Sequence, residues 1–312
     1  MIRLAIFLLS TLLFFYSESL AQQPPELQLD EILSLARDRI ETYKSAFRNL
    51  VATEMRRFGV FDRKGQIKKR RTVKSNFIVY PLPQTTGMAE EFRQILEVDG
   101  KVISKSEVRA EKFFANLLNS VSNDELRKKI LDESYRYDLV NVIGYTTSPG
   151  ICLSSNLRNV FRYKLSTTEN IVGHKIVKID CEQTSETPLI RLSNSKLFPD
   201  NRLVADIDAG VPTSEVSDLR LKATIWLDSE TLQIVKETRE FTVLMLETGK
   251  RVLIQSCNLK FNNSKFEILT PEIITIDLFR PDRKDQILKL AERVEINYSE
   301  FSRPDIEIKV KS

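Results

Sequence analysis

The sequence contains a single histidine, His174, among its 312 residues. A metal site built from several histidines is therefore excluded, and any triad that relies on histidine would have to use this one. The nine glycines form neither the G-x-G-x-x-G pattern of dinucleotide-binding folds nor the G-x-x-x-x-G-K-[ST] pattern of P-loops. We therefore expect a protein that is not an enzyme and that needs no metal or other cofactor.

Cysteine is also scarce, with only Cys152, Cys181 and Cys257 and no C-x-x-C pair. Because three is an odd number, at most one intramolecular disulfide can form and at least one thiol must remain. Cys181 and Cys257 lie in strand-like segments, where cysteine often serves as a small apolar filler. The sequence is compatible with three free structural thiols or with one disulfide, and it does not determine which two cysteines would pair.

The chain has little excess charge of either sign, since 47 lysines and arginines face 43 aspartates and glutamates and leave a net charge of +4. That excess is too small for this length to indicate nucleic acid as a partner. The 42% of hydrophobic and 29% of charged residues are typical of a globular protein.

Only one long apolar run is present, and it lies at the N-terminus. Arg3 precedes the apolar residues 4–16, and small residues follow at Ser19 and Ala21. This is the layout of a secretory signal peptide, and the run is shorter than the roughly 20 residues that a membrane span needs. We expect a signal peptide over residues 1–21 and an exported, periplasmic domain over 22–312 that is soluble after cleavage; an uncleaved anchor is the alternative.

The periodicity of the rest predicts one α+β domain. Apolar residues at spacings of three and four predict a helix over 27–50, and capping-box patterns at Ser104 and Ser122 predict a helix pair. Alternation and turn signals predict strands over 52–62, 67–80, 91–98, 101–103, 159–166, 174–183, 219–228, 232–246, 250–261, 266–278 and 294–310. Residues 185–218 read as an irregular insertion, and 282–293 as a helix.

Several short motifs carry a resemblance to a known family. They are E-F-R at 91–93, E-V-D-G-K at 97–101, the A-T-I-W-L-D-S-E-T-L-Q-I hairpin at 223–234 and N-Y-S-E-F at 297–301. In this order they resemble exported proteins of the LolA/LolB-like lipoprotein-carrier superfamily, although Ala223 stands where that superfamily often has glycine and the 185–218 insertion departs from a compact carrier. The resemblance implies a curved antiparallel sheet, an incomplete β-barrel with an N-terminal helix and a covering helix pair around a hydrophobic hollow. It brings no catalytic residue.

Two functions remain open for such a chain. The first is a non-enzymatic carrier or binder of a hydrophobic group, a lipid or a lipoprotein acyl chain, held in the hollow of the half-barrel. The second is a cell-envelope module that binds protein or a surface while its own side chains fill the core. An apolar cavity would favour the carrier, and a solid core would favour the interaction module.

Two sets of residues are candidates for contact with a partner. For a hydrophobic ligand the candidates are Trp226 and an apolar patch on a predicted helix, formed by Phe113, Phe114 and Leu117. Ordinary packing of these side chains in the core is the alternative. For docking on an anionic membrane surface the candidates are Lys68, Lys69, Arg70 and Arg71, within a run of seven basic residues between 63 and 74. A solvated hairpin that blocks aggregation is the alternative for this run.

Overall fold

The computed structural model describes most of the chain between residues 28 and 303. The described residues are 28–48, 50–81, 89–118, 123–140, 142–171, 174–192, 205–208, 210, 212–281 and 288–303. The predicted signal peptide lies outside them, so its cleavage stays a prediction. No helix among the described residues is long and apolar enough to cross a membrane.

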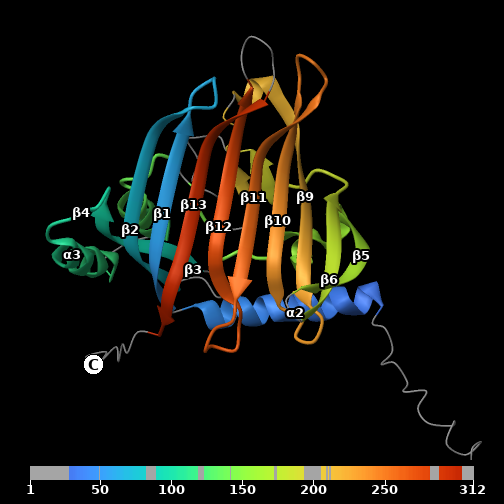
Figure 1. Cartoon of the computed structure of the whole chain (residues 1–312), viewed down its shortest axis with the longest axis horizontal. Helices are drawn as coiled ribbons and strands as arrows, with labels where there is room; N and C mark the ends of the chain where they lie inside the picture. The colour runs from blue at the N-terminus through green and yellow to red at the C-terminus, as the bar shows by residue number, and fades with distance from the viewer. Residues whose placement is uncertain are drawn as a thin grey trace, which may run out of the picture.

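The first described element is helix α2, Leu29–Phe47, which forms as the periodicity predicts. Its apolar stripe is buried and its other face is exposed. The helix lies across the lower ends of the strands (Figure 1), where Tyr43 meets the ring of Phe261 and Phe47 meets that of Phe77. One helix thus closes one end of the sheet over most of its width.

A single antiparallel sheet of eleven strands forms the body of the described chain. Its order is β4-β3-β2-β1-β13-β12-β11-β10-β9-β6-β5, and the two outer strands do not pair with each other, so the sheet stays open. The strands are β1 Val51–Phe61, β2 Ile67–Pro81, β3 Ala89–Val98, β4 Lys101–Val102, β5 Phe161–Ile171, β6 His174–Gln183, β9 Val216–Asp228, β10 Ile234–Met245, β11 Arg251–Asn262, β12 Thr270–Pro281 and β13 Leu288–Ser302. This topology confirms the predicted α+β class with an open, curved antiparallel sheet.

The hairpins follow from the turn residues. Asp99 and Gly100 both have positive φ, 52° and 77°, which is the conformation that a two-residue hairpin turn requires. At the turn between β1 and β2, the Asp62 carboxylate accepts hydrogen bonds from the backbone amides of Lys64 and Gln66. The strands of both hairpins form where the sequence predicted them.

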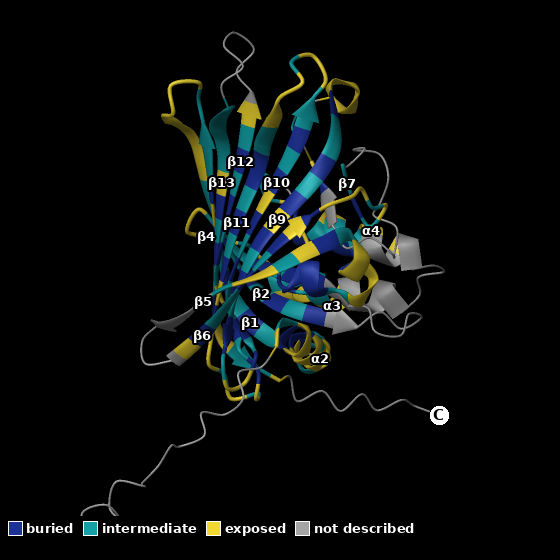
Figure 2. Cartoon of the chain, turned by 90° about the vertical axis from the view of Figure 1, so that its right-hand side faces the viewer, coloured by how far each residue is buried: buried dark blue, intermediate teal, exposed yellow. Residues whose placement is uncertain are grey.

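The concave side of the sheet is covered by helices and by a long crossing segment. Helices α3, Ser106–Leu118, and α4, Asn123–Ser134, lie beside β3. The segment that follows, described over 135–140 and 142–154, crosses the interior to the opposite edge, where Tyr163 of β5 donates a hydrogen bond to Cys152; we call it the crossing segment. It contains the 3₁₀ helix η1, Ile151–Leu153, and the adjoining η2 covers Ser155–Val160. Figure 2 shows α3, α4 and the short strand β7 on the same side of the sheet.

The predicted irregular insertion contains one small regular element. Strands β7, Ile190–Leu192, and β8, Ala205–Ile207, pair in parallel, and η3, Thr213–Glu215, leads into β9. Ile190 and Ile207 are buried in the same core as the large sheet. The described part of the insertion therefore packs on the sheet as well.

One predicted element is wrong. Residues 288–293, part of the helix predicted over 282–293, begin strand β13 instead. Leu290 pairs with Phe279 of β12, and Arg293 pairs with Gly59 of β1. Charged residues at helical spacing favoured a helix in isolation, but the position between two long strands satisfies the backbone on both sides only as a strand.

Candidate functional site

The concave face of the sheet carries a repeated charged pattern. A glutamate and an arginine two positions apart occur on β1, β3 and β10, and all six side chains are buried: Glu54 with Arg56, Glu91 with Arg93, and Glu237 with Arg239. Because side chains at i and i+2 of a strand share a face, each pair points into the half-barrel. The interior is therefore built around ion pairs as well as apolar side chains.

The first ionic cluster joins three elements. Arg93 donates from Nε to both oxygens of Glu54, at 2.8 and 3.1 Å, and Ser75 donates to the same carboxylate at 3.1 Å. Arg56 Nε lies 3.0 Å from Glu54 Oε1 without hydrogen-bond geometry, and its Nη1 forms an ion pair with Asp138. Asp138 lies just beyond α4, so this cluster attaches the α4 region to the sheet.

Glu91 holds the crossing segment from β3. Its carboxylate accepts hydrogen bonds from the backbone amides of Gly144 and Thr146, at 3.3 and 3.2 Å, and from the Thr146 hydroxyl. Arg93 Nη2 lies 3.0 Å from the same carboxylate, and Tyr135 donates to it at 3.3 Å. The protein thus supplies the hydrogen-bond donors and the cation that a buried carboxylate needs.

The pair on β10 holds the crossing segment from the other half of the sheet. Arg239 donates to Glu237 through Nε and Nη2, at 2.8 and 2.9 Å, and to the carbonyl of Ser148 at 2.6 Å. Glu237 in turn accepts the amide of Gly150 at 2.8 Å. Residues 144–150 are therefore fixed by buried ion pairs on two strands far apart in the sheet.

Burial and charge act in opposite directions on the carboxyl groups of this interior. Burial acts to raise the pKa of Glu54, but Arg93 and Arg56 outweigh it and hold that pKa below its usual value. At Asp138 burial prevails over the same two arginines and raises the pKa to about 7. One oxygen of Asp138 is buried without a hydrogen-bond partner, which accounts for the weaker stabilisation of its charged form.

The described side chains fill the centre of the concave face. Side chains with 0% exposure lie on strands across the sheet, including Phe77, Val294, Ile276, Leu259 and Ile225. A side chain that bordered a cavity wide enough for water would keep some accessible surface, so these positions are packed from all sides. Where the resemblance implied a hydrophobic hollow, these described side chains instead belong to a packed core.

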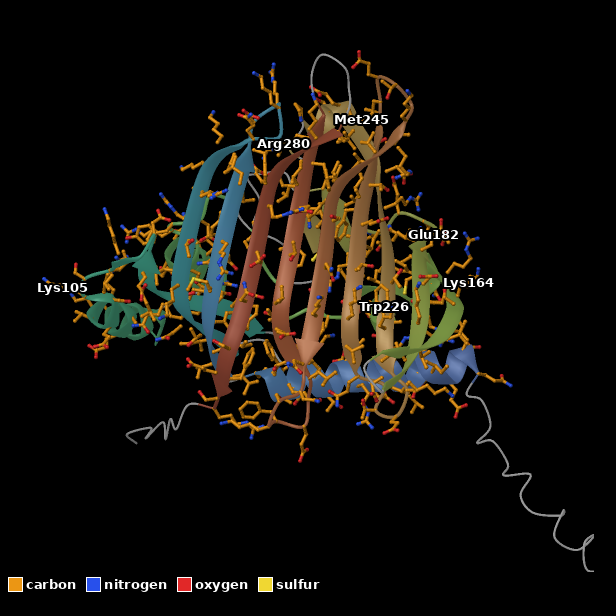
Figure 3. The ribbon with its side chains drawn as sticks, viewed as in Figure 1. Lys105, Lys164, Glu182, Trp226, Met245 and Arg280 are labelled. Atoms are coloured by element: carbon orange, nitrogen blue, oxygen red, sulfur yellow. The ribbon has the colours of Figure 1, made fainter. Side chains whose placement is uncertain are left out.

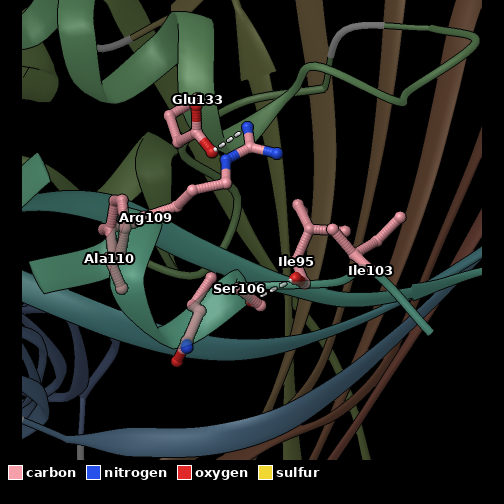
Figure 4. A pocket seen from close by; sticks show the side chains of 8 residues that line it. Ile95, Ile103, Ser106, Arg109, Ala110 and Glu133 are labelled. Carbon is pink, nitrogen blue, oxygen red and sulfur yellow. Dashed lines mark hydrogen bonds and ion pairs between the residues drawn. The ribbon is translucent and has the colours of Figure 1, made fainter. Parts of the chain in front are cut away.

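Two small pockets are present at its margins. One, of about 10 Å³, lies between β3 and α3 beside Ile95, Ile103 and Ser106, with the ion pair of Arg109 and Glu133 at its rim (Figure 4). The other, of about 20 Å³, lies between α2 and the β9–β10 turn beside Ile40 and Phe261. A volume of this size admits about one water molecule and no acyl chain.

The convex face holds the only tryptophan of the chain. Trp226 is half-buried on β9, with the ammonium groups of Lys236 and Lys178 at 4.4 and 5.5 Å from its ring centroid (Figure 3). Its neighbours Ile225 and Leu227 face the core. Any ligand of Trp226 would thus bind the outer surface, and a ligand role for this residue stays a prediction.

The helical members of the candidate ligand site are only partly described. Phe113, Phe114 and Leu117 lie in α3, but their side chains are outside the described residues. The structure places α3 beside β3 at one edge of the sheet, whereas Trp226 lies on β9 near the other edge. The four predicted ligand residues therefore come from two separate regions.

The basic run has a simpler geometry. Lys68, Lys69 and Arg70 are exposed on β2, and Arg63 and Lys64 are exposed in the adjoining turn; we call these five residues the basic hairpin end. Among the described residues, none of the five lies within ion-pair distance of a carboxylate. Arg71 differs from them, because it is half-buried, donates to the carbonyl of Tyr137 at 3.2 Å and lies 3.3 Å from Asp99.

No group of three or more histidine, cysteine, aspartate or glutamate side chains able to hold a metal ion occurs in the described part of the chain. His174 is the first residue of β6. The sequence reasoning missed the ionic interior, although its signal was present: three glutamate-x-arginine triplets at positions where alternation calls for apolar side chains.

The chain matches no protein-family model and no curated protein. Among solved structures it is similar to a domain described as an outer membrane lipoprotein-sorting protein from Vibrio parahaemolyticus, with 10% identity, coverage of 89% of this chain and 93% of that one, and a TM-score of 0.34. It is also similar to a DUF1329 family protein from Desulfovibrio piger, with 12% identity, coverage of 90% and 95%, and a TM-score of 0.33.

A weaker match, with a TM-score of 0.20 and 10% identity over 84% of this chain and 93% of that one, is the complex of MucA and MucB from Pseudomonas aeruginosa. At these scores nothing about ligands or partners passes from those proteins to this chain.

Proposed function

We propose that this chain is a non-enzymatic cell-envelope protein that docks on an anionic lipid surface through the basic hairpin end, while its LolA-like half-barrel serves as a rigid scaffold. The observation that carries the proposal is the set of five exposed cations that lack a carboxylate partner among the described residues. Each cation near an anionic lipid surface contributes about 1 kcal/mol.

Some other cations on the sheet surface are neutralised by neighbouring carboxylates. Arg293 pairs with Asp277 at 2.6 Å, and Arg57 pairs with Glu295 at 2.8 Å. Such exposed pairs screen each other's field. Exposed lysines without an ion pair among the described residues also occur singly on other strands, such as Lys164 on β5 and Lys222 on β9. The basic hairpin end differs because it gathers five such cations within eight positions of the chain, which supplies a local positive field although the net charge of the chain is small.

An exposed apolar residue lies among these cations. Ile67 is 42% exposed at the start of β2, directly before Lys68 and Lys69. Apolar side chains next to cations suit the interface of a lipid bilayer, where the charge meets headgroups and the apolar group reaches the acyl boundary. Ile67 thus adds a short-range contribution to an attraction that is otherwise electrostatic.

The filled interior supports this surface function over carriage of a hydrophobic group. To admit an acyl chain, the crossing segment would have to leave the sheet, and the ion pairs at Glu91 and Glu237 would lose the backbone amides that they now bind. Buried charges without partners cost several kcal/mol each. The carrier function is therefore the less supported of the two that the sequence left open.

Vesicle co-sedimentation tests the proposal. Purified mature protein should bind vesicles that contain phosphatidylglycerol, should bind pure phosphatidylcholine vesicles weakly, and should lose binding as salt rises. The variant in which Lys64, Lys68, Lys69 and Arg70 are all changed to Gln should bind at least tenfold more weakly. Arg71 is kept, because it contacts the crossing segment.

A matched control changes Lys164, Lys175, Lys222 and Lys260, four exposed lysines on other strands, to Gln. It removes the same charge and should keep most of the binding. Equal losses in both variants would reject a specific docking end, and no binding by wild-type protein would leave the basic hairpin end as a solvated surface. Uptake of a fluorescent fatty-acid probe into the protein would favour the carrier function instead.

A further inference from the structure

All three cysteines are free and buried in the same core, and two of them belong to neighbouring parts of it although they lie in different elements. Cys152 lies in η1 of the crossing segment and Cys181 lies on the concave face of β6, and both are 0% exposed. Tyr163 locates them relative to each other, since it is the direct partner of Cys181 in the β5–β6 ladder and donates its hydroxyl to the Cys152 carbonyl at 2.7 Å.

Two hydrogen bonds place residues 148–152 above this row of the sheet, since Arg239 donates to the Ser148 carbonyl and Tyr163 donates to that of Cys152. Cys181 pairs with Ala223 of β9, and Ala223 pairs with Arg239 of β10. Burial, the neighbouring Cys181 thiol and the charge of Glu237 raise the pKa of the Cys152 thiol well above its usual value, against the opposing charge of Arg239.

The third cysteine lies apart from this pair. Cys257 is on β11, directly opposite Arg239, and is therefore separated from Cys181 by β9 and β10. The groups that act on its pKa are Arg239, Glu237 and Asp277, and neither of the other thiols is among them. Cys257 is thus the cysteine without a nearby thiol partner among the three.

From this geometry we propose that Cys152 and Cys181 form a disulfide when the protein folds under oxidising conditions, and that Cys257 remains a buried thiol. The two thiols lose two protons and two electrons to a disulfide oxidant, such as oxidised glutathione, which is reduced to two thiols. The bridge joins the crossing segment to the sheet near its β5 edge and closes a loop of about 30 residues.

The bridge would complete the attachment of the crossing segment. Glu91 and Glu237 fix residues 144–150 through hydrogen bonds. A covalent bond two residues further on would fix the segment at η1. The proposal is independent of lipid docking, because it concerns the interior and uses none of the residues of the basic hairpin end.

Peptide mapping tests the pairing directly. Protein unfolded and refolded with oxidised glutathione is blocked with an alkylating reagent under denaturing conditions and digested with trypsin without reduction. The expected product links the peptide of residues 137–158 to that of 179–191, and the peptide of 252–260 carries the alkylated Cys257. Recovery of both Cys152 and Cys181 in alkylated form, or of Cys257 in a bridge, would overturn the proposal.

Thermal unfolding provides a second measurement that does not depend on peptide recovery. Oxidised wild-type protein should have a Tm about 5 °C or more above that of the reduced protein, because the bridge restricts the unfolded chain. Cys257→Ala should keep this difference, whereas Cys152→Ala and Cys181→Ala should abolish it. An unchanged difference in the latter two variants would contradict the pairing, and the mapping of wild-type protein stands even if a variant fails to fold.

Discussion

Glu54 of β1 and Arg93 of β3 form a buried ion pair of 2.8 Å across the intervening strand β2. The contact is feasible because β2 places the small Ser75 directly opposite Glu54, and Ser75 itself donates to the carboxylate. Both charged side chains are at most 1% exposed. In the part of the half-barrel formed by β1, β2 and β3, buried ion pairs therefore stabilise the fold together with apolar packing.

This pair yields a prediction on stability. Arg93→Met should lower the free energy of unfolding by about 3–5 kcal/mol, because Glu54 and Glu91 would both lose a buried cation. Urea unfolding measures the change. Arg57→Met removes the cation of an exposed pair with Glu295 and should cost less than about 1 kcal/mol. A loss as small for Arg93→Met as for Arg57→Met would show that the buried cluster is not formed.

Asp138 predicts a dependence of stability on pH. Its pKa is raised to about 7 in the folded protein and is near 4 when unfolded, so the folded state binds the extra proton between these values. The stability from this group is thus fully present below about pH 4 and is lost as pH rises through about 7. The loss is on the order of 3 kcal/mol.

Asp138→Asn should remove that slope, because an amide does not titrate. Urea unfolding at pH 5, 6, 7 and 8 should show wild-type stability falling relative to the variant as pH rises. Asp132→Asn, at an exposed position of α4, is the matched control and should keep the wild-type slope. Parallel profiles for wild type and Asp138→Asn would refute the raised pKa.

Gly150 predicts a steric limit on the crossing segment. Its φ is 61°, and an added Cβ would lie 2.5 Å from Cδ1 of Ile40 and 2.9 Å from Cδ1 of Ile234. Gly150→Ala should therefore destabilise the protein by about 2–4 kcal/mol, through backbone strain and overpacking. Gly65 has φ 77° and open space around it, so Gly65→Ala should cost only about 1 kcal/mol. Equal thermal shifts in the two variants would disprove the close packing at Gly150.

The fluorescence of Trp226 can distinguish docking through the basic hairpin end from docking through the convex face of the sheet. As the sole tryptophan, half-buried on the convex face, it should be quenched by acrylamide in the folded protein. Docking through the basic hairpin end should leave its emission maximum unchanged, because Arg63–Arg70 lie in the β1–β2 turn and on β2, and five strands lie between β2 and β9. A blue shift on addition of anionic vesicles would indicate that the convex face binds the lipid.

The sequence by itself determined most of the local structure. The spacing of apolar residues determined α2, and Asp99 with Gly100 determined the hairpin between β3 and β4, because these preferences act within a few residues. The exposure of Lys68 to Arg70 followed in the same way, since consecutive charges on a strand point to both of its faces.

Only the tertiary structure decided what lies inside. Glu54, Glu91 and Glu237 look like solvent-exposed residues in the sequence, yet each is buried beside an arginine because the crossing segment and α4 cover the concave face. Residues 288–293 became a strand for a related reason, since their partners on β1 and β12 are distant in the chain. Burial of a charge and pairing of a central strand depend on contacts between distant segments, and no local pattern specifies such contacts.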